Sequence, residues 1–73
     1  MSRRLTTRTA MAVTRKAGVH DRYAGRDPDA GVIRLGILPA DAETAMRAIL
    51  AVWPDAVVSY SAIGHTLEIE EPT

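Results

Sequence analysis

Apolar and polar side chains alternate along residues 32–38, where Ile33, Leu35 and Ile37 share one side and Arg34 lies on the other. This period of two predicts a strand with one buried face. The preceding residues, Asp27 to Gly31, combine aspartate, proline and glycine, which is typical of a turn.

A different period follows, because apolar side chains recur every three or four residues from Pro39 to Trp53. This spacing predicts an amphipathic helix of about fourteen residues. Pro39 suits the first turn of a helix, and Pro54 disfavours helical geometry at the residue before it. Glu43 and Arg47 lie four residues apart in the order that favours an ion pair.

Two further stretches, residues 57–63 and 66–71, flank Gly64-His65, which predicts a hairpin with a two-residue type II′ turn. Pairing position 63 with position 66 places Tyr60 opposite Ile69. In this register the apolar side chains gather on one face and serines meet glutamates on the other, as expected for a half-buried antiparallel pair.

These elements predict an α+β domain, residues 19–73, of β-α-β-β order with one helix packed on a three-stranded sheet. A crossover through the helix makes the first two strands parallel, and the first and last strands are expected at the sheet edges. Residues 19–23 offer a short fourth strand, with Val19 and Tyr23 facing in. The order resembles the first part of a ferredoxin-like split βαβ unit without its second helix and fourth strand; the resemblance implies no function. We expect the core to contain Ile33, Leu35, Ile37, Ala45, Met46, Ile49, Leu50, Trp53, Tyr60, Leu67 and Ile69.

Charge divides the 73-residue chain, although its formal net charge is zero. Residues 1–26 carry a net charge of +6 and residues 27–73 a net charge of −6. Residues 1–18 also show no sustained apolar period, so we expect a basic N-terminal arm that is flexible or ordered by a partner. The candidate contact residues are Arg3, Arg4, Arg8, Arg15, Lys16, Arg22 and Arg26.

Four roles remain open for this arm. It neutralises the acidic body, it lies along nucleic-acid phosphates, it orders in an acidic groove of another protein, or it is an organellar transit peptide. Residues 1–18 contain no aromatic side chain to stack on bases and no apolar helical face, which argues against the second and fourth roles.

Catalytic and cofactor chemistry find little support in the sequence. The absence of cysteine excludes disulfides and thiolate ligands. His20 and His65 have no neighbour at metal-ligand spacing, and no glycine-rich phosphate loop is present. We therefore expect no enzyme activity and no catalytic, metal or cofactor site.

A body of about forty residues ordinarily needs association to be stable. The sequence predicts a non-enzymatic accessory protein that docks onto a larger protein or self-associates, using its basic arm and an exposed sheet edge. The alternative is a nucleic-acid-binding accessory protein; small phage and mobile-element proteins are built in either way. Neither a secretory signal nor a membrane-spanning stretch is apparent, so we expect it in the cytoplasm.

Overall fold

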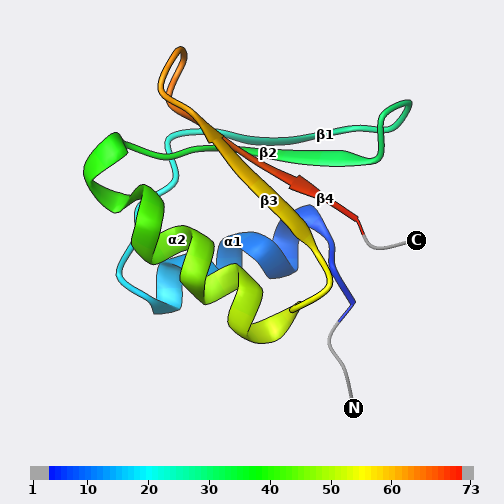
Figure 1. Cartoon of the computed structure of the whole chain (residues 1–73), viewed down its shortest axis with the longest axis horizontal. Helices are drawn as coiled ribbons and strands as arrows, with labels where there is room; N and C mark the ends of the chain where they lie inside the picture. Colours follow the sequence, from blue (N-terminus) through cyan, green and yellow to red (C-terminus); the bar gives the residue numbers. More distant parts are fainter. Residues whose placement is uncertain (1–3, 72–73) are drawn as a thin grey trace.

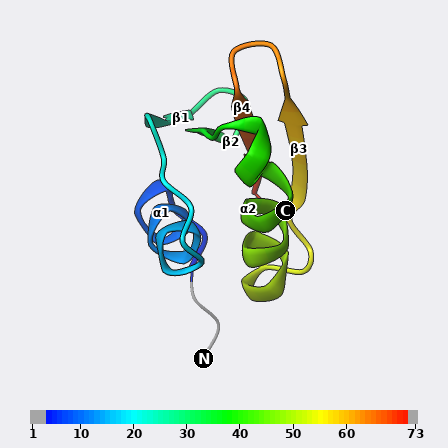
Figure 2. The same ribbon diagram turned by 90° about the vertical axis from the view of Figure 1, so that its left-hand side faces the viewer.

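The computed structural model describes residues 4–71 and arranges them as two helices beneath a four-stranded sheet (Figure 1). The elements are α1 (Thr7–Lys16), β1 (Ala24–Asp27), β2 (Val32–Gly36), α2 (Pro39–Val52), β3 (Val57–Ser61) and β4 (Thr66–Glu70). Both helices lie on the same side of the sheet, and the other face has no helix over it (Figure 2). The predicted α+β class is confirmed: the sheet has the fourth strand that the sequence left open, and a second helix joins the one that was predicted.

The strand order is β1-β2-β4-β3, and every neighbouring pair is antiparallel. β2 and β3 therefore run parallel, as predicted, but β4 lies between them. The expectation that the first and last predicted strands form the edges is wrong, because β2 and β4 are central. Their register explains this: Ile33 faces Ile69 and Leu35 faces Leu67 on the helix side, so the most apolar strands bury each other.

The hairpin between β3 and β4 forms on the predicted faces but in a different register. Ser61 faces Thr66, so the loop has four residues instead of two. The shift of two positions preserves the faces and places Val58, rather than an alanine, among the pairs on the helix side. Valine buries more apolar surface than alanine, which favours this register. The hydroxyl of Tyr60 also donates to the Ile37 carbonyl at 2.7 Å.

The N-terminal segment differs most from the expected arm, because residues 7–16 form helix α1 and pack against the core. Thr6 caps the helix: its hydroxyl accepts from the Thr9 N–H at 3.1 Å, and the Thr9 hydroxyl accepts from the Thr6 N–H at 2.9 Å. Ala10 and Val13 are buried on the inner side. Residues 7–16, which were expected to belong to a flexible or partner-ordered arm, are therefore part of the folded domain.

The fourth strand exists, but it lies at residues 24–27 instead of 19–23. Val19 is buried as expected, whereas Tyr23 is half exposed, which corrects its predicted inward orientation. Gly18 lies between α1 and this strand with φ of 86°, and the N–H of Val19 donates to the Thr14 carbonyl at 3.0 Å. This is a Schellman ending, in which a left-handed glycine closes the helix and the next apolar residue packs inward.

The complete order α-β-β-α-β-β is the ferredoxin-like order β-α-β-β-α-β begun from a different element. β2, α2, β3 and β4 form the split βαβ unit that the sequence indicates. The second helix and fourth strand of that unit, which the sequence did not assign to it, precede it in the chain as α1 and β1. The sheet of residues 4–71 is therefore complete for this arrangement.

Most of the predicted core is confirmed: all of the expected strand and helix residues are buried or packed against the core except Leu50, which is 38% exposed. α2 itself has the predicted bounds. Val19, which was expected to face in, belongs to the core as well. Further residues of the N-terminal segment and of the loop before β3 complete the core and were not predicted: Leu5, Ala10, Val13 and Ala56.

Candidate functional site

The seven predicted contact cations divide into two groups. Arg3 lies outside the described residues. Arg15 and Arg26 are each held by a carboxylate of this chain, while the others are exposed and make no ion pair within residues 4–71, namely Arg4, Arg8, Lys16 and Arg22.

The two paired arginines stabilise the fold. Arg15 donates through Nε and Nη2 to the two carboxylate oxygens of Asp21, at 2.8 and 3.2 Å. Arg26 donates in the same bidentate way, through Nε and Nη2, to the two carboxylate oxygens of Glu71, at 2.6 and 3.2 Å. This ion pair connects β1 to the residue that follows β4. The hydrogen bonds from these arginines hold the pKa of Asp21 and of Glu71 below the usual range of a carboxyl group.

The outer surface of α1 forms a shallow hollow of about 430 Å³. We call it the α1 hollow; it is lined by Thr7, Arg8, Met11, Ala12 and Arg15. Met11 is partly buried against the core, and Ala12 is exposed. An apolar floor therefore lies between two arginines, of which only one is paired within the described chain.

The uncovered face of the sheet has the opposite charge. Arg34 lies at its centre and donates to Glu68 at 3.0 Å and to Asp27 at 3.4 Å. The pKa of Asp27 is lowered, chiefly because its carboxylate accepts backbone N–H bonds from Ala30 and Asp29. One cation thus faces two carboxylates, and this face keeps a negative excess.

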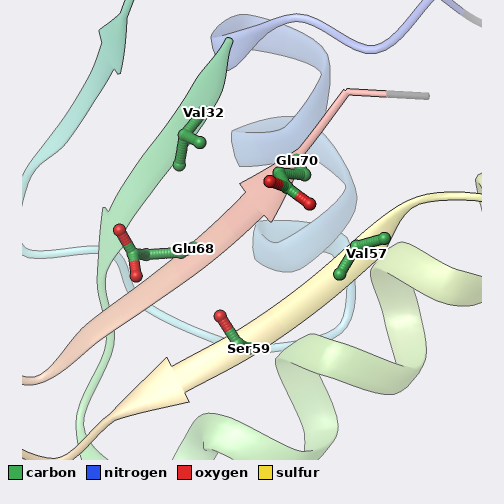
Figure 3. A pocket seen from close by; sticks show the side chains of 5 residues that line it. All are labelled: Val32, Val57, Ser59, Glu68 and Glu70. Carbon is green, nitrogen blue, oxygen red and sulfur yellow. The ribbon is translucent and has the colours of Figure 1, made fainter. Parts of the chain in front are cut away.

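A second depression, of about 180 Å³, lies on this same face and is shown in Figure 3. Val32 on β2 and Val57 on β3 flank Glu70, while Ser59 lies beside Glu68 across β3 and β4. The side-chain carboxylate of Glu70 makes no hydrogen bond or ion pair with residues 4–71, whereas its backbone is paired within the sheet. The depression offers carboxylates to a cation but is open to solvent.

Residues 4–71 contain neither a cluster of potential metal ligands nor a membrane-spanning helix. No group of three or more potential ligands is close enough to hold a metal ion there. None of the helices in this part of the chain is long and apolar enough to cross a membrane. His20 is exposed between α1 and β1, and His65 lies in the β3–β4 loop. The two histidines therefore do not share a helix or strand.

The sequence alone does not indicate the α1 hollow, because in a segment without predicted structure the basic residues share no common face. Arg8, Met11, Ala12 and Arg15 are spaced i, i+3, i+4 and i+7, which is the spacing of one helix face. That spacing becomes informative only once residues 7–16 are recognised as a helix.

The comparisons with known proteins add no relative. No protein family, no curated protein and no solved structure matches this chain.

Proposed function

We propose that this protein is a non-enzymatic interaction module that docks onto an acidic surface of a larger protein through the α1 hollow. The observation that carries the proposal is an apolar floor, Met11 and Ala12, beside an exposed arginine, Arg8, with no intramolecular partner in the described chain. An apolar side chain of a partner can pack on this floor while carboxylates of the same partner pair with the surrounding cations.

The position of Arg8 supports an external role. It is the second residue of α1, where the partial positive charge of the helix N-terminus disfavours a cation by a few tenths of a kcal/mol. The first turn contains no acidic residue to compensate. By contrast, Arg15 and Lys16 lie in the last turn, where the helix dipole favours them. Helix stability therefore accounts for those two cations and not for Arg8.

Nucleic acid is the second candidate, since Arg4, Arg8, Lys16 and Arg22 are free to meet phosphates. A protein partner is favoured because the lining of the α1 hollow includes no aromatic side chain for base stacking. The uncovered sheet face, which is acidic, would repel a phosphate backbone. With either partner, we propose that this protein acts in the cytoplasm.

The test is photo-crosslinking from Ala12 in cells, with a photoreactive amino acid replacing this exposed residue at the centre of the α1 hollow. The matched control places the same group at Thr44, an exposed residue of α2. We expect a discrete protein adduct from position 12 only. Arg8→Glu should weaken it about tenfold, because the substitution reverses the charge at the rim of the hollow.

The same variant separates docking from folding. Arg8→Glu places an acid near the N-terminus of α1, so the free energy of unfolding should stay the same or rise by a few tenths of a kcal/mol. Loss of the adduct with an intact urea transition supports the proposal. Adducts that disappear on nuclease treatment would favour the nucleic-acid alternative, and equal adducts from positions 12 and 44 would contradict both.

A further inference from the structure

The two edges of the sheet are protected to different degrees. β1 is a four-residue edge that contains Gly25 and the charged residues Arg26 and Asp27, and Pro28 follows it. Charge, shortness and proline are the features by which natural proteins discourage pairing at an edge. β3, the opposite edge, reads Val-Val-Ser-Tyr-Ser and contains no charged residue, glycine or proline.

The residues of β3 also suit a further strand. Val57 is 60% exposed on the uncovered face of the sheet, although valine is among the residues usually buried in strands. Val58 and Tyr60 lie on the helix side and are only partly buried against the core. The edge therefore leaves apolar surface exposed on both faces of the sheet.

The backbone groups that point outward from β3 can be identified. The N–H of Ile37 donates to the carbonyl of His65 at 2.8 Å, so position 65 bonds toward β2. Hydrogen-bonding direction alternates along a strand, so positions 66, 68 and 70 bond toward β3. Their partners at positions 61, 59 and 57 use their backbone groups inward, which leaves those of Val58 and Tyr60 directed away from the sheet.

We propose that two copies of this chain associate through antiparallel pairing of their β3 strands about a two-fold axis at Ser59. This pairing sets Val58 opposite Tyr60 of the second copy, and Tyr60 opposite its Val58, so their outward N–H and C=O groups satisfy one another. A β-branched residue opposite an aromatic residue is a favourable cross-strand pair. The two four-stranded sheets become one continuous sheet of eight strands.

A second copy is the occupant that best fits this edge. An uncharged strand can face itself without like charges meeting, and the contact is isologous, so it closes as a dimer and does not propagate. The inference concerns a surface other than the α1 hollow: Figure 2 shows β3 at one edge of the sheet and α1 beneath the β1 side. It therefore holds or fails independently of the proposed docking function.

A single cysteine tests both the association and its register, because the natural chain contains none. Ser59→Cys places the two sulfur atoms beside the two-fold axis, where adjacent strands bring Cα atoms within disulfide distance. Ser61→Cys is the matched control, because the same register separates its two copies by four strand positions, or about 13 Å. Under mild oxidation we expect a covalent dimer from position 59 and at least about tenfold less from position 61.

Sedimentation of the unmodified protein over a wide concentration series completes the test. We expect the mass to rise toward a dimer, and Ser59→Lys to raise the dimer dissociation constant about tenfold or more, since two lysines would then face each other. Lysine at this position faces Glu68 within its own sheet, so the monomer should keep its fold. Gly25→Lys, on the β1 edge, should leave the dimer unchanged. A protein that stays monomeric throughout, or equal crosslinking at positions 59 and 61, would overturn the proposal.

Discussion

At the scale of single residues, the contact between Tyr23 and Gly36 shows how one side chain ties three strands together. The Tyr23 ring crosses β2 at Gly36, and its hydroxyl shares a 2.5 Å hydrogen bond with the Thr66 hydroxyl on β4. A Cβ atom at position 36 would overlap that ring. The glycine is therefore explained by the space that the tyrosine needs and not by backbone conformation.

We predict that Gly36→Ala lowers the free energy of unfolding by about 1 kcal/mol or more, because the methyl group displaces the Tyr23 ring. Urea denaturation measures the change. In the double variant Tyr23→Ala with Gly36→Ala, the second substitution should cost much less, since the ring is gone. Strictly additive losses would show that the two residues do not interact.

A second prediction concerns the buried carboxyl of Asp21, whose side chain is 5% exposed while that of Arg15 is 58% exposed. The hydrogen bonds from Arg15 lower the pKa of Asp21 in the folded state. The stability contributed by this pair is thus fully present above the unfolded pKa of about 4, and it is lost as pH falls through the lower folded pKa.

Asp21→Asn should accordingly be less stable than the natural chain at neutral pH, and the difference should shrink once the pH drops below about 4. Urea unfolding midpoints across a pH series measure this convergence. Asp55→Asn, which removes an exposed carboxyl without an ion pair in the described chain, serves as the control. A difference that stays constant down to the acid limit would contradict the assignment.

At the scale of elements, α1 supplies what the β-α-β-β unit lacks. Its inner side contributes Ala10 and Val13, and Leu5 packs just before it. Thr14 is also fully buried, and its hydroxyl is satisfied within the helix by the carbonyls of Ala10 and Met11, at 3.2 and 3.1 Å. A threonine paired in this way can be buried at little cost, which is why the inner side of α1 does not look apolar in the sequence.

We therefore predict that a chain beginning at Val19 does not unfold cooperatively. Fully burying one valine or leucine contributes about 1.5–3 kcal/mol, which is comparable to the total stability of so small a domain. Circular dichroism during urea titration provides the measurement. As a milder control, Thr6→Ala should lose about 1 kcal/mol through the helix cap and remain cooperative. An unchanged transition in the shortened chain would show that α1 is dispensable.

At the scale of the whole molecule, the fold itself separates the charges. The free cations of the N-terminal segment lie just before, on and after α1, whereas the acids surrounding Arg34 lie on the uncovered sheet face. The pair between Arg26 and Glu71 is one place where the two halves of the chain neutralise each other directly. Partial neutralisation thus occurs, and Arg8 and Lys16 are left available.

The two proposed surfaces also combine at this scale. A dimer joined through β3 leaves both α1 hollows open, because α1 lies beneath the opposite part of the sheet (Figure 2). Such a dimer presents the same docking surface twice. Against a partner with repeated acidic sites, two weak contacts then act together through their high effective concentration.

The sequence by itself determined the features that depend on short-range periodicity. The helix at residues 39–52, the strand beginning at Val32 and the faces of the hairpin follow from spacing and from Pro39 and Pro54. Face assignment survived even where the hairpin register was wrong, because a shift of two residues returns each side chain to the same side.

Only the tertiary structure decided the features that depend on distant partners. The position of β4 between β2 and β3 results from the match of Ile33 and Leu35 with Ile69 and Leu67, more than thirty residues away. α1 was not predicted because its buried positions are one alanine, one valine and one threonine, Ala10, Val13 and Thr14, which form too weak an apolar pattern to indicate a helix without the core they cover. The α1 hollow and the unprotected β3 edge, on which both proposals depend, are consequences of that packing.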